Sequence, residues 1–323
     1  MSADMQTTTV AASSAQGAGT PAIVVDTLSK SYGSHRVVDQ LSFTVQQGEI
    51  FALLGPNGAG KTTTIEMLEG YRSADSGTVR VLGLDPIRQG HELKPRIGVM
   101  LQQDGLYQDL NAREILHLFA SYYARPQNAA NLLERVGLAD VAKTRYRRLS
   151  GGQKRRLALA VTLVGLPQLV FLDEPTTGMD PQARLATWEI IRELKHNGVT
   201  ILLTTHLMDE AERLADRVAI VDHGRLIALD TPTKLTGVQD ANVIRFVAPA
   251  GLDCTLLAAL PSARSAEEIR PGSYLLETET APALLAELTA WLRDQHITLS
   301  ELRVGHGSLE DLFLRLTGAE VRE

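Results

Sequence analysis

The chain has 323 residues, which is enough for one large domain and a small one, or for two domains of medium size. Its 32 basic and 38 acidic residues give a net charge of −6, which argues against a general nucleic-acid-binding protein. The single cysteine, Cys254, excludes a disulfide within the chain and favours a reducing cytoplasm.

The start of the chain is small and polar, and it lacks the basic start and apolar core of a signal peptide. We therefore expect a disordered tail at residues 1–21. The longest apolar stretch, residues 157–172, is interrupted by Gly165, Pro167 and Gln168 and falls short of a membrane span. It predicts a buried helix, a turn and a buried strand, so any contact with a membrane is expected through a partner protein.

The segment GPNGAGKT, residues 55–62, has the spacing of a phosphate-binding loop, and an apolar strand precedes it while helical periodicity follows. Its glycines let backbone N–H groups converge on phosphates. Lys61 is long enough to reach the β- and γ-phosphates, and the Thr62 hydroxyl suits Mg²⁺. The loop predicts binding of ATP and Mg²⁺. The nucleotide-binding residues expected here are Gly55, Pro56, Asn57, Gly58, Ala59, Gly60, Lys61, Thr62 and Thr63.

Two further apolar strands end in residues suited to hydrolysis. The segment LVFLDEP places Asp173 and Glu174 at a strand end, where open α/β sheets bind ligands. We expect Asp173 to hold Mg²⁺ through water and Glu174 to accept a proton from the attacking water. The segment VTILLTTH ends in His206, which can orient that water and bond the γ-phosphate. Taken alone, the LVFLDEP segment could instead be a solvated acidic strand end, and His206 could be a structural histidine.

The segment LSGGQKRR, which begins at residue 149, predicts a second anion-binding helix start. Ser150 is a suitable N-cap, and the glycines after it leave backbone N–H groups accessible. The bases in the first turn have the wrong charge for a helix N-terminus unless an anion binds there. Residues 143–156 contain seven bases and no acid. A nucleic-acid-binding surface is the alternative, and an anion-facing or carboxylate-paired patch near the nucleotide is favoured because the net charge is negative.

The composition changes near Gly237. Beyond it the pattern predicts strands, a helix at residues 281–295, another strand and a last helix in which Ser308 and Asp311 form a capping box. We expect a small accessory α+β domain at residues 237–323.

Together these segments resemble the ATP-binding cassette (ABC) ATPases. The phosphate-binding loop, LSGGQ, LVFLDEP and TTH occur in the order of that family over residues 23–232. The resemblance implies an α/β P-loop NTPase cassette at residues 22–236. It would consist of a RecA-like core, an antiparallel β subdomain and a helical subdomain at about residues 104–165.

The resemblance also implies roles for residues that no physical pattern singles out. Tyr32 would stack on adenine, and Gln102 would touch Mg²⁺ and the attacking water and sense the membrane partner. Asp180 would lie in a loop that contacts the other subunit of a dimer. The residues that would contact the ATP of that other subunit are Ser150, Gly151, Gly152 and Gln153.

Residues 66–86 and 307–318 resemble a narrower group, the cassettes that serve ABC-2 type exporters. The resemblance implies an ATPase that powers export of a drug, an antibiotic or a lipid-like substrate through a separate permease. It would act as a head-to-tail homodimer at the cytoplasmic face of the membrane, with no specific nucleic acid bound. An importer cassette, or a soluble ABC ATPase with a regulatory or nucleic-acid-linked role, is the alternative.

Overall fold

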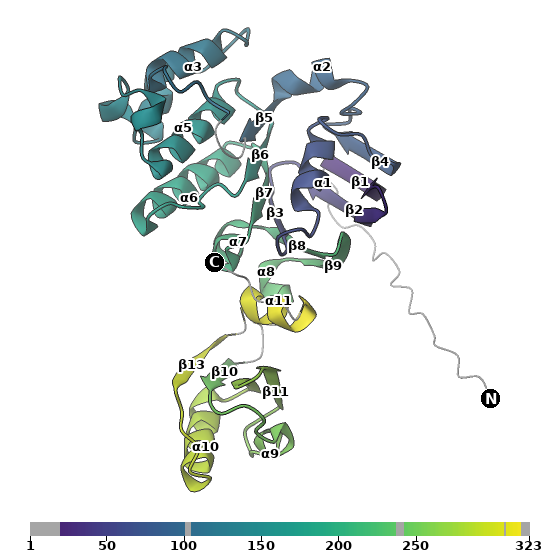
Figure 1. The fold of residues 1–323 in the computed structure, drawn as a ribbon, viewed down its shortest axis with the longest axis vertical. Coiled ribbons are helices and arrows are strands. Elements are labelled where there is room, and N and C mark those ends of the chain that lie inside the picture. Colours follow the sequence, from purple (N-terminus) through teal and green to yellow (C-terminus); the bar gives the residue numbers. More distant parts are fainter. Residues whose placement is uncertain (1–19, 101–104, 237–241, 307, 318–323) are drawn as a thin grey trace, which may run out of the picture.

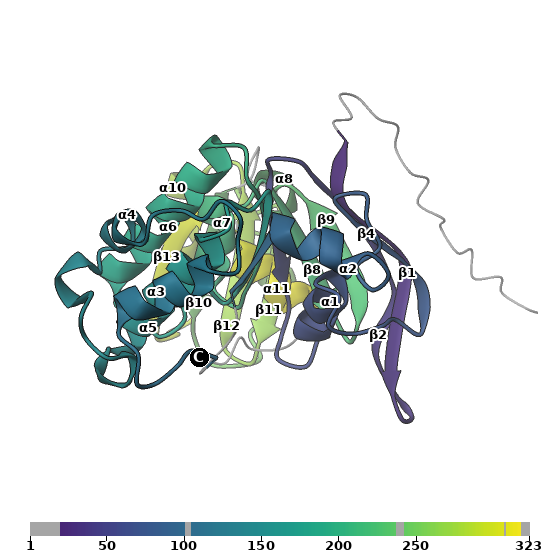
Figure 2. The same ribbon diagram turned by 90° about the horizontal axis from the view of Figure 1, so that it is seen from above.

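The computed structural model describes residues 20–100, 105–236, 242–306 and 308–317, so Gln102 and most of the expected tail lie outside the described residues. Three β-sheets organise these residues (Figure 1). Two of them pack together with most of the helices, and the third belongs to the C-terminal part of the chain. Figure 2 shows the small N-terminal sheet on one side of the central sheet and the helices α3, α4 and α5 on the other.

The N-terminal sheet is antiparallel and has the strand order β2-β1-β4. Its strands are β1 (Pro21–Tyr32), β2 (His35–Gln46) and β4 (Ser76–Val81). The long hairpin of β1 and β2 turns at Gly33, which has a φ of 60°. The hairpin supplies the antiparallel β layer of the fold.

The central sheet has six strands in the order β5-β6-β7-β3-β8-β9, and its first five strands run parallel. They are β5 (Ile97–Met100), β6 (Leu169–Asp173), β7 (Thr200–Thr205), β3 (Ile50–Leu54), β8 (Arg217–Asp222) and β9 (Arg225–Asp230). The antiparallel β8–β9 hairpin turns at His223 and Gly224, both of which have positive φ angles. Strands β3, β6 and β7 are buried along their whole length, which explains their unbroken apolar runs.

Alternate residues of the central strands pack into two different cores because successive side chains of a strand point to opposite faces. Phe51 and Phe171 pack toward the N-terminal sheet and α1 (Lys61–Leu68). Ala52 and Leu172 pack toward the helical side. The elements on and around the helical side include α5 (Gly151–Leu163), α6 (Pro181–His196) and α7 (Met208–Leu214).

The remaining helices of the first 236 residues are short. They are α2 (Gly90–Leu93), α3 (Ala112–Ala120), α4 (Ala129–Arg135) and α8 (Pro232–Leu235), with single 3₁₀ turns at Lys94–Arg96, Ala139–Val141 and Tyr146–Arg148. Helices α3, α4 and α5 begin at side-chain caps, which are Asn111, Asn128 and Ser150. Because each cap satisfies backbone N–H groups that a helix start leaves open, it fixes where the helix begins.

The C-terminal part contains a four-stranded antiparallel sheet of order β11-β12-β10-β13. Its elements are β10 (Asn242–Val247), α9 (Cys254–Ala258), β11 (Ser265–Arg270), β12 (Ser273–Thr278), α10 (Ala281–Asp294) and β13 (Glu301–His306). One face of the sheet forms its own hydrophobic core with α10, in which Phe246 stacks on Tyr274. The sequence predicts every one of these elements except α9 and β11.

The last helix, α11 (Leu309–Thr317), leaves this sheet and packs on α7 and α8 (Figure 1, yellow). Leu309 and Phe313 are fully buried in the same core as the central sheet. The expected capping box is present, because the Ser308 N–H donates to Asp311 over 3.0 Å and the Asp311 N–H donates to the Ser308 hydroxyl over 3.2 Å. The Leu309 N–H donates to Glu212 of α7. The chain therefore returns to the core that its first 236 residues build.

Phe313→Ala should destabilise the protein by about 3–5 kcal/mol, because it removes a fully buried ring and leaves a cavity between α11 and α7. Denaturant unfolding and hydrogen exchange at α7 measure the effect. Leu256→Ala, at a side chain that is 53% exposed, is the control and should change little. Equal stability of the two variants would show that α11 does not contribute to the core.

Candidate functional site

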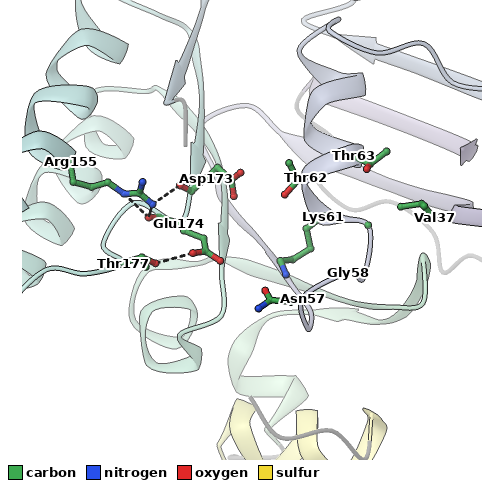
Figure 3. Close-up of a pocket in the computed structure, with 11 residues that line it drawn as sticks. Val37, Asn57, Gly58, Lys61, Thr62, Thr63, Arg155, Asp173, Glu174 and Thr177 are labelled. Atoms are coloured by element: carbon green, nitrogen blue, oxygen red, sulfur yellow. Dashed lines mark hydrogen bonds between the residues drawn. The ribbon is translucent and has the colours of Figure 1, made fainter. Parts of the chain in front are cut away.

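A cavity of about 710 Å³ opens at the edge of the central sheet where β3 and β6 end. Its volume lies in the range of small-molecule and cofactor sites. Figure 3 shows the side chains that converge on it from α1, α5 and the segment after β6. Its lining residues are Val37, Asn57, Gly58, Gly60, Lys61, Thr62, Thr63, Arg155, Asp173, Glu174 and Thr177.

The predicted phosphate-binding loop joins β3 to α1 and forms one wall of the cavity. Gly58 and Gly60 have φ angles of 85° and 94°, which favour glycine. A Cβ atom on Gly60 would also lie 2.5 Å from the Val37 carbonyl oxygen. Because Gly60 is the N-cap and has no side chain, the first N–H groups of α1 have no side-chain cap. Such a helix start is suited to bind phosphate.

Other residues of the loop pack against β8 and the β8–β9 turn. Among the described residues, Gly55, Pro56 and Ala59 do not line the cavity. A Cβ atom at Gly55 would come 2.3 Å from the Val221 carbonyl oxygen, so the loop passes close to β8. The Ala59 carbonyl accepts a hydrogen bond from the Gly224 N–H at 3.1 Å.

Lys61 lies in the cavity wall and is 7% exposed. Its Nζ donates to the carbonyl oxygens of Gly55 at 2.7 Å and Pro56 at 3.0 Å. Burial lowers the pKa of this ammonium, and the charges of Glu174 and Asp173 act in the opposite direction. An anionic group in the cavity would compensate the buried charge.

Asp173 and Glu174 occupy the end of β6, as the sequence predicts. Asp173 is 8% exposed and accepts a hydrogen bond from the Thr204 hydroxyl on the neighbouring strand β7. The Glu174 N–H donates to the Thr204 carbonyl oxygen at 3.0 Å. The pairing of β6 with β7 therefore fixes the Asp173 carboxyl group and the Glu174 backbone at the cavity.

Glu174 and His206 come together although 31 residues separate them in the sequence. His206 Nδ1 lies 3.1 Å from Glu174 Oε1, and the Thr177 hydroxyl donates to Glu174 Oε2 at 3.1 Å. The bond to Glu174 raises the pKa of His206, and the bond to His206 lowers the pKa of Glu174. The pair therefore favours an ionised carboxylate beside an imidazolium.

Two of the three expected Mg²⁺ ligands, Thr62 and Asp173, line the cavity, and the third, Gln102, lies outside the described residues. Within the described ranges there is no group of three or more His, Cys, Asp or Glu side chains that could hold a metal alone. One hydroxyl and one carboxylate suit a hard cation that takes its other ligands from phosphate and water. The residues present thus fit Mg²⁺ bound together with a nucleotide.

The helix start at Ser150 is formed as predicted but does not line this cavity. Ser150 and Gln153 make a capping box with N–H···O distances of 2.9 and 3.2 Å. Ser150 and Gly151 are exposed, and neither they nor Gly152 and Gln153 line the described cavity.

The basic segment 143–156 shows part of the expected pattern, because Arg147 pairs with Asp109 at 3.1 Å and Arg155 lines the cavity. The first turn of α5 is held mainly by carbonyl groups. Arg155 and Arg156 donate to backbone carbonyl oxygens, those of residues 173–174 and 136–137 respectively. The Lys154 ammonium lies 5.1 Å from the centre of the Tyr146 ring. Protein groups therefore engage these three cations.

Two further predicted residues lie outside the cavity. Tyr32 ends β1 and is 42% exposed, with the Lys30 ammonium and the Arg72 guanidinium 5.8 and 5.6 Å from its ring centre. Asp180 is the N-cap of α6 and accepts from the Ala183 N–H at 2.9 Å.

Sequence reasoning missed three residues that line the cavity: Val37, Arg155 and Thr177. Thr177 follows Glu174 by three residues, so one turn of chain could have placed it there. No local sequence pattern indicates that Val37 lines the cavity or that the Arg155 side chain points into it.

Comparison with known proteins identifies the chain. Residues 38–177 match the ABC transporter family model. The chain is 42% identical over 316 residues to "Nod factor export ATP-binding protein I" of Ralstonia nicotianae, covering 94% of this chain and 96% of that protein. The chain belongs to the ABC transporter family. This cassette is also 36% identical to "Linearmycin resistance ATP-binding protein LnrL" of Bacillus subtilis, over 92% of this chain and 99% of the relative.

Solved structures agree. A structure described as an ATP-binding subunit of an ABC transporter is 30% identical and superposes with a TM-score of 0.62, covering 67% of this chain and 92% of the other. A crystal structure described as the ADP conformation of an ATP-binding cassette of an ABC transporter shares the fold at 23% identity and a TM-score of 0.59, over 66% of this chain and 92% of the other. The predictions of an α/β P-loop ABC fold and of a transport ATPase are confirmed. Among the described helices, none is long and apolar enough to cross a membrane.

The Glu174–His206 pair predicts a pH dependence in the nucleotide-free and metal-free protein. Because the folded pKa of His206 lies above 6.5, its stabilising contribution is complete below pH 6.5 and is lost as pH rises through the folded value. Because the folded pKa of Glu174 lies below 4.5, its contribution is present above pH 4.5 and is lost on acidification. The pair should therefore be strongest between about pH 4.5 and 6.5.

The measurement is an NMR titration of the His206 ring. In Glu174→Gln the His206 midpoint should fall back toward 6.5, because the hydrogen bond that raises its pKa is weakened. A His206 midpoint that does not respond to the substitution would contradict the ion pair.

Proposed function

We propose that this chain is the ATP-hydrolysing subunit of an exporter and that it works through a separate membrane permease. The ABC family supplies the ATPase activity, and the names of the relatives support export over import. One observation of the structure carries the proposal. Lys61, Thr62, Asp173 and Glu174 line one cavity, while Ser150 and Gly151 face solvent elsewhere on the same chain.

The cavity binds the triphosphate of ATP in this proposal. The N–H groups of the loop and of the α1 start contact the phosphates, together with Lys61 in place of its present carbonyl partners. Thr62 and Asp173 would hold Mg²⁺ and Gln102 would be the third ligand; the bound cation would neutralise phosphate charge. Tyr32, which is 42% exposed, would stack on the adenine outside the cavity that holds the phosphates.

Hydrolysis requires a water positioned beside the γ-phosphate. Glu174 accepts the proton of that water, because its pKa is held low and the carboxylate is ionised at neutral pH. His206 orients Glu174 and can bond the γ-phosphate after ATP enters. The Thr177 hydroxyl donates to the other oxygen of this carboxylate, so the Glu174 side chain is held in one orientation.

A second copy of the chain completes each ATP site in this proposal. The exposed α5 start at Ser150, Gly151, Gly152 and Gln153 presents N–H groups that suit a γ-phosphate. Asp180 lies at the start of α6 and contacts the facing subunit. A head-to-tail homodimer places each of these starts over the cavity of the partner, and loss of the γ-phosphate after hydrolysis opens it again.

The domain division follows from this arrangement. We assign residues 22–236 to the cassette, with a helical subdomain at about residues 104–165, and residues 237–323 to an accessory domain. The segment 105–110, where Tyr107 is 56% exposed, forms part of the surface that receives the permease. The protein then lies on the cytoplasmic face of the membrane without crossing it. A nucleic-acid role has less support, because Arg155 and Arg156 are engaged by carbonyl groups.

Glu174→Gln tests the base. The substitution should lower kcat by about a hundredfold or more, because a positioned general base contributes roughly that much. ATP binding should persist, and an ATP-bound dimer should accumulate on size-exclusion chromatography. Glu189→Gln, at an exposed carboxylate on α6, is the matched control and should behave as the wild type. Substantial hydrolysis by Glu174→Gln would remove Glu174 from the base role.

Ser150→Arg tests the second copy. The bulky cation should block the approach of the facing phosphate, so hydrolysis and ATP-dependent dimerisation should both be lost. Each separate chain should still bind ATP, because Ser150 does not line its own cavity. Ser121→Arg, at an exposed serine that follows α3, controls for the added charge. Normal turnover in Ser150→Arg would refute a site shared between two chains.

A further inference from the structure

Arg155 connects two parts of the cassette that serve different ATP sites in the proposed dimer. It lies in α5, one turn beyond the Ser150 start that faces the partner chain. Its guanidinium points the other way, into the chain's own cavity (Figure 3). Nε donates to the Glu174 carbonyl oxygen at 3.0 Å, and Nη2 donates to the same oxygen and to the Asp173 carbonyl oxygen, the latter at 3.2 Å.

Glu174 has a backbone that needs such support. Its φ of 49° lies in the left-handed region, which side-chain-bearing residues rarely adopt. Pro175 follows directly, and a proline restricts the conformation of the residue before it. A conformation of this kind persists only where neighbouring groups hold it. The Glu174 N–H is held by Thr204, and its carbonyl is held by Arg155.

We propose that Arg155 is the positioning residue of the base. Its guanidinium clamps the backbone of Glu174 in the left-handed conformation that directs the carboxylate at the attacking water. A guanidinium can bridge two neighbouring carbonyl oxygens because its donors form a rigid planar fork. The inference rests on the proposed function, in which Glu174 is the base and two chains share each ATP.

The connection gives α5 a second task. Its exposed start contacts ATP bound to the partner chain, while Arg155 one turn later holds the base that acts on the chain's own ATP. If α5 moves when the dimer closes, the Arg155 side chain transmits that movement to the backbone of Glu174. Closure of the α5 start over the partner's ATP is thereby coupled to alignment of Glu174 at the chain's own ATP.

The first test separates positioning from nucleotide binding. In the full-length chain, Arg155→Gln should lower kcat by about a hundredfold, as a small misplacement of a reacting group can. ATP affinity, measured with a fluorescent ATP analogue, should stay within about twofold, because the proposed contacts are to backbone carbonyls and not to nucleotide. A large loss of ATP affinity would overturn the proposal, since Arg155 would then act as a phosphate ligand.

Arg156→Gln is the matched control. Arg156 is the next residue of α5 and also donates to two carbonyl oxygens, those of Val136 and Gly137, each at 3.1 Å. These carbonyls lie at the end of α4, outside the cavity. The variant loses a comparable structural contact but should keep the wild-type kcat. An equal loss of kcat in both variants would show that Arg155 only stabilises α5.

The second test uses dimers of two differently tagged chains, purified through both tags. One chain carries Glu174→Gln, so a single working base remains, on the other chain. Arg155→Gln should abolish most of the remaining turnover when placed on the chain with the intact Glu174. Placed on the chain that carries Glu174→Gln, it should leave turnover unchanged. Equal loss in both arrangements would overturn the proposal.

Failure of the Glu174 assignment and failure of the Arg155 proposal give different results in these dimers. If dimers with Glu174→Gln on both chains still hydrolyse ATP, the base assignment fails before Arg155 is tested. If Arg155→Gln does not fold, Arg155→Lys replaces it in the same dimers. A lysine keeps the charge but has no planar fork, so turnover should again fall only beside the intact Glu174. Unchanged turnover there would overturn the proposal.

Discussion

The parallel pairing of β3, β7 and β6 is the constraint on which the site depends. Leu54 pairs with Thr205, and Asp173 pairs with Thr204, so the three strands end at the same edge of the sheet. The phosphate-binding loop, the carboxyl pair and His206 each follow one of these ends directly. Because parallel strands are hydrogen-bonded in a fixed register, groups from three segments that lie far apart in the sequence meet at this edge.

The cavity built on this edge combines a buried cation with carboxylates that are held by neighbouring strands. Lys61 rests on carbonyl oxygens of its own loop, and Glu174 is held by His206, Thr177, Thr204 and Arg155. The carboxylate of Glu174 is therefore oriented before a nucleotide enters. Positioning of this kind lowers the cost of arranging the reacting groups later.

The C-terminal part is joined to the cassette more closely than its composition indicates. Helix α11 inserts Leu309 and Phe313 into the core beneath α7, and its N–H at Leu309 is satisfied by Glu212 of α7. Arg245 of β10 pairs with Asp311 of α11. Helix α7 begins two residues after His206, so the C-terminal sheet is linked through α11 and α7 to the edge where the site lies.

The sequence by itself determined the elements with a strong local signal. The apolar runs of β3, β6 and β7, the glycines of the loop and the caps at Ser150 and Ser308 each predict an element, because period, backbone freedom and capping are local properties. The family resemblance added Tyr32, Gln102 and Asp180. Only the tertiary structure decided that Arg155 turns inward to Glu174, that Val37 lines the cavity and that α11 returns to the core. These outcomes depend on which distant surface each side chain meets, and no spacing along the chain contains that information.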